Sequence, residues 1–348
     1  SQPALAGPTQ EGNGNFAYGF DITGMQTFND QFTTMSHCSW HSTLPPDGLN
    51  PGQFKQTAVK THGRLIKYPL PNPEQSKLSQ WLASNPHRFN LGRIGLYLKK
   101  RNGNTAKIGD IENTVQHFDL WTGIAESTFI FEGQPVKVTT VGDPRLDIVS
   151  FKIESPLIQE GRLGVFIEFP YASLKYFSNG SDYDHPLLHH TKLTQTSNHS
   201  ATFERHLDST FYQVSCKWTG TGKIKKLKDH FYNFLPGNNQ KSVEYVFYFS
   251  PSKNNNKIPS FSRVKINSAN YWPSFWKSGG AVDLSQSKDP RWFELERRIV
   301  LSQYIVAINA AGNYPPQETG LVNNSWYGRF NYEMYWWHAA HYALWDRW

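Results

Sequence analysis

Short β-like runs follow one another along most of the chain, and this succession constrains the fold more than any other feature. Each run is rich in β-branched or aromatic residues, and Gly, Pro, Asn or Asp separates it from the next. The clearest runs are residues 129–131, 136–141, 148–153, 163–169, 211–218 and 243–249. Short strands with such turns are typical of antiparallel sandwiches and barrels. We therefore predict a mainly β fold, with no helix of convincing length before residue 270.

The pattern changes near residue 285. Asp289 and Pro290 suit the N-cap and first position of a helix, and residues 292–311 carry apolar side chains at helical spacing. Gly312 then signals the end of that helix. A second aromatic run, from Tyr332 onward, predicts another helix. We accordingly expect a β domain over residues 1–275, a linker with a long helix over 276–313, and the start of a helical domain over 314–348.

Aromatic content is high and charge content is low. Of the 348 residues, 38 % are hydrophobic and 15 % aromatic, which indicates a globular chain with a sizeable core. Phe and Tyr favour strands, so a β core is the preferred interpretation of the aromatic residues before residue 270. For the tryptophans near the end of the chain we favour a carbohydrate-binding surface.

The net charge of +7 permits an acidic partner, either a nucleic acid or an anionic glycan. The basic residues are nevertheless scattered, and the one dense run, Lys223 to Lys228, alternates like an exposed edge strand. The sequence has no phosphate-binding loop and no nucleic-acid motif. It also has no apolar run of the ~20 residues that a membrane helix needs. Neither a nucleic-acid nor a membrane partner is expected.

The two cysteines, Cys38 and Cys216, are too few for a disulfide scaffold and lack zinc-site spacing. Whether they pair is left open. The first residues are rich in Ala, Gly, Pro and Gln and lack an initiator Met. That composition fits either a mature protein after removal of a signal peptide or an arbitrary cut, and we expect an extracytoplasmic protein, periplasmic or secreted.

A polar and aromatic cluster between Tyr314 and Trp348 carries the strongest functional signal. The Pro315-Pro316 pair would present Gln317 and Glu318 rigidly, and an amide beside a carboxylate suits hydrogen bonds to vicinal hydroxyls. The alternative is a structural turn in which Glu318 caps the next segment. The candidate substrate-binding residues are Gln317, Glu318, Asn324, Trp326, Phe330, Glu333, Trp337 and His338.

Helical spacing relates several of these residues. Glu333 and Trp337 would share one face, and a carboxylate among aromatic residues needs a hydrogen-bond partner or a ligand. His338 and His341 stand three residues apart and could ligate a metal, but no third ligand is evident. We expect no metal and no cofactor.

Two other motifs are weaker. His37 and Cys38 resemble a base and nucleophile only superficially, because no orienting carboxylate is evident. Residues 182–185, Asp-Tyr-Asp-His, form a polar stretch that we interpret as a structural loop, with a Ca²⁺ or sugar contact as the alternative.

The order of these parts resembles the maltose and kojibiose phosphorylases, and the α-fucosidases and related glycoside hydrolases with an (α/α)6 barrel. Residues 90–95, Asn-Leu-Gly-Arg-Ile-Gly, are similar to the Gly-Asn-Gly-Arg-Leu-Gly element of the fucosidase family. Residues 328–334, Gly-Arg-Phe-Asn-Tyr-Glu-Met, are similar to the phosphorylases' Gly-His-x-Phe-Trp-Asp-Thr-Glu. By that match Phe330 and Glu333 would line a sugar subsite. The Trp-Asp pair is missing and the spacing is one residue shorter, so the subsite chemistry need not be the phosphorylases'.

The resemblance implies a large antiparallel β super-sandwich, a linker helix and the first helix or helices of an (α/α)6 barrel. It implies a carbohydrate-active enzyme of the glycoside hydrolase type that acts on an oligo- or polysaccharide by acid/base chemistry. The catalytic acid and base would lie deeper in the barrel, so this chain would be inactive by itself and would need the remainder of its helical domain. Two alternatives stay open: a polysaccharide lyase on a uronate-containing glycan, with His or Tyr as base, and a non-catalytic carbohydrate-binding domain.

Overall fold

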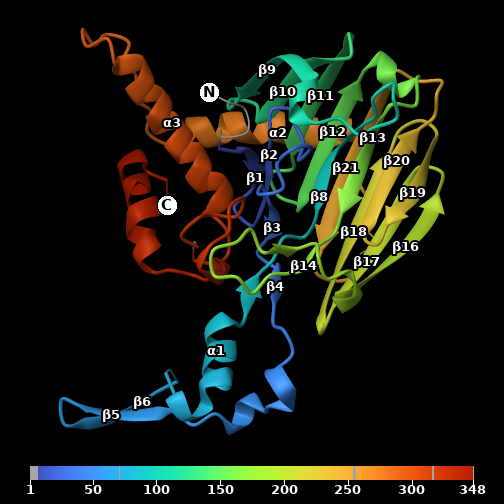
Figure 1. Cartoon of the computed structure of the whole chain (residues 1–348). Helices are drawn as coiled ribbons and strands as arrows, with labels where there is room; N and C mark the ends of the chain where they lie inside the picture. Colours follow the sequence, from blue (N-terminus) through green and yellow to red (C-terminus); the bar gives the residue numbers. More distant parts are fainter. Residues whose placement is uncertain (1–6, 70, 254–255, 316, 348) are drawn as a thin grey trace.

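Two antiparallel sheets face each other and form the main mass of the molecule (Figure 1). The computed structural model describes residues 7–69, 71–253, 256–315 and 317–347. The larger sheet has eight strands, in the order β16 (His189–Ser197), β17 (Ser200–Leu207), β18 (Thr210–Trp218), β21 (Ser242–Ser250), β12 (Ile148–Glu154), β11 (Gln134–Gly142), β10 (Ile124–Phe131) and β9 (Ile111–Asp119). The smaller sheet has four, in the order β19 (Gly222–Lys228), β20 (Phe231–Pro236), β13 (Leu163–Glu168) and β8 (Arg93–Leu98). All six strand runs predicted from the sequence are confirmed.

The main core lies between the two sheets, and strict alternation along the strands decides which side chains enter it. On β21, Tyr245 and Phe247 face the smaller sheet, where Phe234 of β20 packs against both. Val246, between them, points to the opposite face. This is the period-two pattern of a sheet that is covered on both sides. The core interpretation of the aromatic residues before residue 270 is thus confirmed for these strands.

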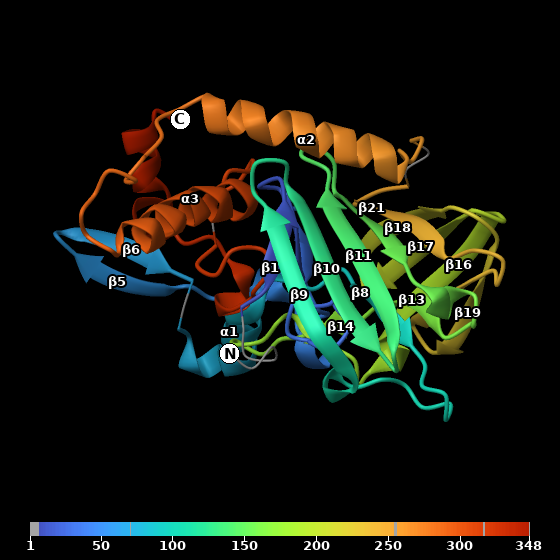
Figure 2. The ribbon, with the colours of Figure 1, turned by 90° about the horizontal axis from the view of Figure 1, so that it is seen from above.

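Helix α2 (Phe261–Lys277) covers the outer face of the eight-stranded sheet (Figure 2). Phe261 and Val264 pack there against Val246 and its neighbours on β11 and β12. The Ser260 side chain accepts a hydrogen bond from the backbone N–H of Arg263 at 3.2 Å and so caps the helix. The prediction of no helix before residue 270 is wrong. The internal Pro273 interrupts the helical signal in the sequence, and the docked apolar face stabilises the helix instead.

Helix α3 (Trp292–Asn309) confirms the predicted linker helix, and it packs on a small N-terminal sheet. That sheet contains β1 (Thr9–Gly12), β2 (Phe16–Phe20) and β3 (Thr34–Ser36). The Tyr304 hydroxyl donates to the backbone carbonyl of Gln10 at 2.9 Å, and Asn309 Nδ2 donates to Gln10 Oε1 at 2.8 Å. Residues far apart in the sequence are thereby joined at one site.

The two long helices meet around Trp272, which is 2 % exposed. Its indole lies 4.7 Å from the ring of Tyr304, measured between centroids. Gly123, in the turn between β9 and β10, makes the close approach feasible: a Cβ there would lie 2.2 Å from Cδ1 of Trp272, and the residue has φ +63°. This glycine therefore lets α2 sit directly on the sheet edge.

A thin arm projects from the body (Figure 1). It carries helix α1 (Ser76–Ser84) and the hairpin of β5 (Thr57–Thr61) and β6 (Arg64–Tyr68). At its base, β4 (Trp40–His41) pairs with β7 (His87–Arg88), and β14 (Tyr171–Ala172) pairs with β15 (Ser181–Asp182) nearer the sandwich. Short 3₁₀ turns cover Pro46–Gly48, Pro51–Gln53, Pro73–Gln75, Ile108–Asp110, Pro156–Ile158, Pro186–Leu188 and Trp326–Gly328.

The predicted second helix exists, but it is not a regular α-helix. It is a π-helical turn over Tyr335–Ala339 followed by a 3₁₀ stretch over Ala340–Trp345. Arg347 holds its end against both long helices: Nε donates to Gln303 Oε1 at 3.0 Å, and the guanidinium carbon lies 4.2 Å from the centroid of the Phe275 ring. We call residues 314–347 the terminal segment.

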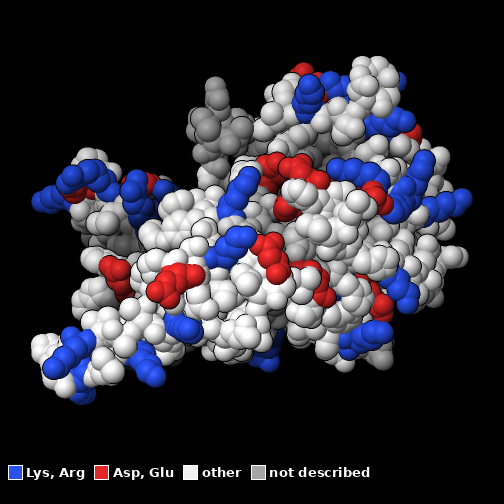
Figure 3. Space-filling view, turned by 60° about the horizontal axis from the view of Figure 1, so that its bottom comes forward, with Lys and Arg blue, Asp and Glu red and all other residues white. Residues whose placement is uncertain are grey.

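Lys and Arg are dispersed among Asp and Glu on the face shown in Figure 3. The lysine-rich strand β19 is an edge strand with mostly exposed side chains, which confirms its prediction. Cys38 and Cys216 are both free thiols. In the described part of the chain, no helix combines the length and apolar character needed to cross a membrane.

Candidate functional site

The eight predicted site residues fall into three neighbourhoods. Four of them form one group: Trp337 and His338 face α3, Glu333 is bonded to Trp337, and Glu318 lies near His338. Two lie beside β4 and β7: Gln317 and Phe330. Two contact the loop of residues 176–178: Asn324 and Trp326. Only the first group is brought together around one surface.

A groove of about 430 Å³ runs between α3 and the terminal segment. We call it the terminal groove. The α3 side contributes aliphatic side chains, a hydroxyl and a guanidinium, and the terminal segment contributes two indoles and two imidazoles. The lining residues are Arg298, Ile299, Ser302, Ile305, Val306, Trp337, His338, His341 and Trp345.

Hydrogen bonds fix both indoles of the terminal groove. Trp337 Nε1 donates to Glu333 Oε1 at 3.1 Å, so the predicted shared face of these two residues is confirmed. Trp345 Nε1 donates to His341 Nδ1 at 3.0 Å. An indole nitrogen can only donate, so His341 Nδ1 carries no proton and Nε2 carries it. This imidazole is therefore a hydrogen-bond donor of defined orientation.

The imidazoles of the terminal groove are neutral near pH 7. Partial burial lowers the pKa of His338, and nearby Glu318 opposes that shift. Burial also lowers the pKa of His341, against a hydrogen bond to the backbone carbonyl of His338. Neutral imidazoles, indole faces and the Ser302 hydroxyl form a set that can hydrogen-bond and stack without requiring a charged ligand.

Phe330 belongs to a second aromatic group. Its ring is stacked on Tyr314 at 5.8 Å and 11°, and it meets Trp40 edge-on at 5.5 Å. Tyr314 in turn is stacked on His37 at 5.9 Å, and the Arg88 guanidinium lies 4.6 Å from the Trp40 ring. This group joins the terminal segment to β4 and β7.

Gln317 is buried beneath this group, at 3 % exposure, and its backbone pairs with Phe330. Both polar atoms of its side chain are buried without a partner among the described residues. The cavity beside it measures about 10 Å³, which is close to the space of a single water molecule. Gln317 therefore does not line the terminal groove. Pro316, half of the predicted rigid turn, lies outside the described residues.

Trp326 and Asn324 brace a loop. The Trp326 ring lies 4.9 Å from Tyr176, and Asn324 Nδ2 donates to the Ser178 carbonyl at 3.0 Å. Trp326 and the residue after it have φ of +54° and +58°, a conformation that costs non-glycine residues about 1–3 kcal/mol each. Gly328 follows with φ +62°, and a Cβ there would lie 2.6 Å from that of Arg88. This left-handed run directs the indole away from the terminal groove.

Sequence reasoning missed Arg298, Ser302 and Trp345 as lining residues. The one local signal for Arg298 and Ser302 is their spacing of four residues, which places them on one helix face. A solvent-exposed helix face would show the same spacing. His341 is likewise not among the eight predicted site residues. Within the described ranges, no group of three or more His, Cys, Asp and Glu side chains is arranged as a metal site.

Comparison with known proteins gives similarity at the level of structure only. No family profile and no curated protein matches the sequence. The structure is similar to a putative kojibiose phosphorylase from the human microbiome, with a TM-score of 0.51 and 12 % identity, over 84 % of this chain and 38 % of that one. A bacterial glucoamylase solved with acarbose gives a TM-score of 0.41 and 9 % identity, over 63 % of this chain and 35 % of that one.

The match to the phosphorylase confirms, at the level of fold, the resemblance and the mainly β architecture inferred from the sequence. This chain spans little more than a third of the length of these two structures. At such low identity the likeness defines the fold and carries no residue roles.

Proposed function

We propose that this chain is the β super-sandwich and the barrel entry of a carbohydrate-active enzyme of the glycoside hydrolase type, acting outside the cytoplasm on an oligo- or polysaccharide. The observation that carries the proposal is the fold likeness to a putative kojibiose phosphorylase over 84 % of the chain. In this proposal the terminal groove is one wall of the sugar pocket.

The chemistry of the terminal groove suits a saccharide. Indole faces pack against the C–H faces of sugar rings, and the Trp337 indole is already held in place by Glu333. His338 and His341, both neutral near pH 7, offer hydrogen bonds to hydroxyl groups. Glu318 and Glu333 are therefore proposed as binding and positioning residues, with no catalytic role assigned to either.

The catalytic acid and base are proposed to come from the remainder of the helical domain. The terminal segment exposes large apolar side chains, with Trp336 at 72 %, Leu344 at 77 % and Tyr332 at 78 % exposure. An apolar surface of this kind suits cover by further helices. Such helices would close the terminal groove and bring acid/base groups to a bound sugar.

Glycan binding by the isolated chain tests the proposal. A glycan array, followed by calorimetry with kojibiose and with any array hit, should show binding that Trp337→Ala weakens. Trp121→Ala is the matched control, because Trp121 is a 48 % exposed indole outside the terminal groove. Absence of binding to every neutral and acidic glycan would overturn the proposal, as would equal loss in both variants.

A lyase acting on a uronate-containing glycan is the second candidate. Arg298 lines the terminal groove, and the chain carries a net charge of +7, both of which favour an acidic sugar. Preferential retention of uronate polymers on the array, with binding that weakens steeply as salt increases, would select this candidate.

A further inference from the structure

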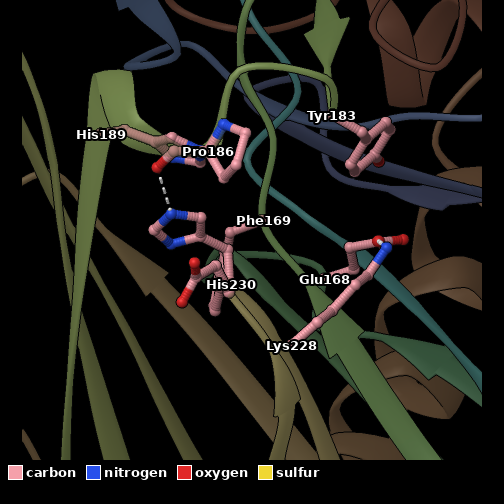
Figure 4. A pocket seen from close by; sticks show the side chains of 8 residues that line it. Glu168, Phe169, Tyr183, Pro186, His189, Lys228 and His230 are labelled. Atoms are coloured by element: carbon pink, nitrogen blue, oxygen red, sulfur yellow. Dashed lines mark hydrogen bonds and ion pairs between the residues drawn. The ribbon is translucent and has the colours of Figure 1, made fainter.

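A second pocket, far from the terminal groove in the fold, opens at one end of the sandwich. It has a volume of about 200 Å³ and lies where β13 and β20 of the smaller sheet approach the start of β16 in the larger one. Six of its lining residues carry the argument: Glu168, Tyr183, His189, Lys228, Asp229 and His230. We call it the sandwich-end pocket (Figure 4).

A buried guanidinium fixes one side of the sandwich-end pocket. Arg205 on β17 is fully buried, and its Nη2 donates to His189 Nδ1. Arginine has no acceptor, so His189 Nδ1 must be unprotonated and its Nε2 must carry the proton. That Nε2–H has no protein partner among the described residues, and His189 therefore retains one unused donor.

His230 is fixed in the same way. Its Nε2 donates to the Pro186 carbonyl at 2.8 Å, which is the dashed line in Figure 4. Its Nδ1 then accepts from the Thr191 hydroxyl at 2.6 Å. The His189 and His230 rings are stacked with centroids 3.7 Å apart.

Both imidazoles are neutral near pH 7. Burial, reinforced by the Arg205 charge, lowers the pKa of His189 to about 2. Burial is also the main cause of the lowered pKa of His230. Neither ring therefore offers a positive charge to a ligand.

The facing side of the pocket is polar, and its negative and positive side chains are paired with each other. Figure 4 shows Glu168, Lys228 and Tyr183 across from the two imidazoles. The Glu168 carboxylate, 7 % exposed, pairs with Lys228 Nζ at 2.8 Å and with Arg93 Nη1 at 3.7 Å. The Tyr183 hydroxyl is buried and has no hydrogen-bond partner of good geometry in the described chain, although Ser181 lies near it.

From this arrangement we propose that the sandwich-end pocket binds one neutral sugar ring, as a second saccharide site. Its volume is below the ~300–1,000 Å³ of pockets for drug-sized ligands, so it suits a single ring. An anion would meet the carboxylates of Glu168 and Asp229, and a cation would meet the ammonium group of Lys228. A neutral polyol meets neither repulsion, and its hydroxyls match the imidazole donor, the phenol and the carboxylate.

The test uses the whole chain in a Trp337→Ala background, so that sugar binding at the terminal groove does not contribute. Saturation-transfer NMR with the methyl glycosides of glucose, galactose, mannose and xylose supplies neutral probes, and glucuronate and inorganic phosphate supply anionic ones. Tyr183→Phe removes only the hydroxyl, and Tyr176→Phe is the matched control elsewhere on the surface. Thermal unfolding checks that each variant folds.

We expect at least one neutral glycoside to bind, with an affinity that Tyr183→Phe lowers roughly two- to tenfold, as for one lost hydrogen bond. Tyr176→Phe should leave that affinity unchanged. Absence of neutral binding would overturn the proposal, and so would stronger binding of glucuronate or phosphate, or equal affinities in folded Tyr183→Phe and in the parent chain. Every protein in this experiment carries Trp337→Ala. A negative result would therefore overturn the sandwich-end site alone and would leave the proposal for the terminal groove to its own experiment.

Discussion

The Trp337 indole nitrogen lies 3.1 Å from Glu333 Oε1, so the aromatic surface of the terminal groove is oriented by a carboxylate at its rim. Glu333→Ala removes the acceptor and should weaken saccharide binding several-fold by freeing the indole to rotate. Glu333→Gln keeps an acceptor oxygen and should bind nearly as well as the parent. Calorimetry measures both affinities, and the indole N–H resonance of Trp337 in ¹⁵N spectra reports the hydrogen bond. Equal affinities of the alanine and glutamine variants would contradict this positioning role.

The junction of α2 and α3 depends on Trp272. Truncation by Trp272→Ala should lower the free energy of unfolding by about 3–5 kcal/mol, because it leaves a cavity against Tyr304 and the sheet edge. Trp121→Ala, at a half-exposed indole, should change it by no more than about 0.5 kcal/mol. Urea unfolding followed by circular dichroism gives both values. A cost below about 1 kcal/mol for Trp272→Ala would be inconsistent with this packing.

Glu11 on β1 should make the stability of the protein depend on pH. It is 1 % exposed and its Oε1 has no partner among the described residues, so desolvation raises its pKa well above 4.5, against a backbone hydrogen bond from Gly142. Above pH 4.5 the unfolded carboxyl loses its proton while the folded one retains it. The free energy of unfolding therefore falls by about 1.4 kcal/mol per pH unit until the pH exceeds the folded pKa.

Glu11→Gln cannot titrate, and it should be more stable than the parent by a margin that grows with pH from about 4.5. Urea unfolding of both proteins over a pH series measures that margin. Glu112→Gln on β9 is the control, because its side chain is exposed. A margin that stays constant across the series would show that Glu11 does not titrate in this way.

Asn309 joins the end of α3 to two other segments. Its Nδ2 donates to Gln10 Oε1 at 2.8 Å, and its Oδ1 accepts from the Leu321 amide at 2.7 Å. Asn309→Leu has a similar volume but leaves these groups without hydrogen-bond partners. Each buried unpaired group should lower the free energy of unfolding by about 1–3 kcal/mol. Asn309→Asp retains the acceptor and should cost less. Hydrogen exchange of the Leu321 amide distinguishes the two, and equal protection in both variants would refute the role of the Oδ1 acceptor.

Local patterns predicted the sandwich because each strand has its own signature: alternation inside the strand and a turn outside it. The hairpin of β10 and β11 shows why, since Glu132 and Gly133 both have positive φ in a tight turn that the sequence marks clearly. The same local reasoning did not predict helix α2. Its stability comes from docking on β11, β12 and β21, which no local window contains.

The same distinction applies to the candidate site. Glu333 and Trp337 were correctly paired because helical spacing alone relates them. Gln317 and Trp326 lie apart from that pair because tertiary contacts decide their positions. The Gln317 backbone pairs with that of Phe330, and the Trp326 ring packs on Tyr176. Of the sandwich-end pocket, only Tyr183 lies in a stretch that the sequence marked as a possible sugar contact, residues 182–185. The imidazoles gave no such local signal, since Arg205, which contacts both, lies on a different strand.

The hydrogen bond between Tyr304 and Gln10 joins residues 294 positions apart in the sequence. During synthesis, the N-terminal sheet must therefore wait for its partner residues in α3 to be made. The inner side chains of β2, such as Phe16, can be covered once the sandwich strands have formed, whereas Ala17 and Met35 pack with Leu321 and Val322 near the end of the chain. At about 5–20 residues per second, a ribosome takes roughly 15–60 s to make the intervening chain. Throughout that interval the face of β2 that carries Ala17 lacks Leu321 and Val322 in the nascent protein, and a chaperone that recognises apolar strands would find its target there.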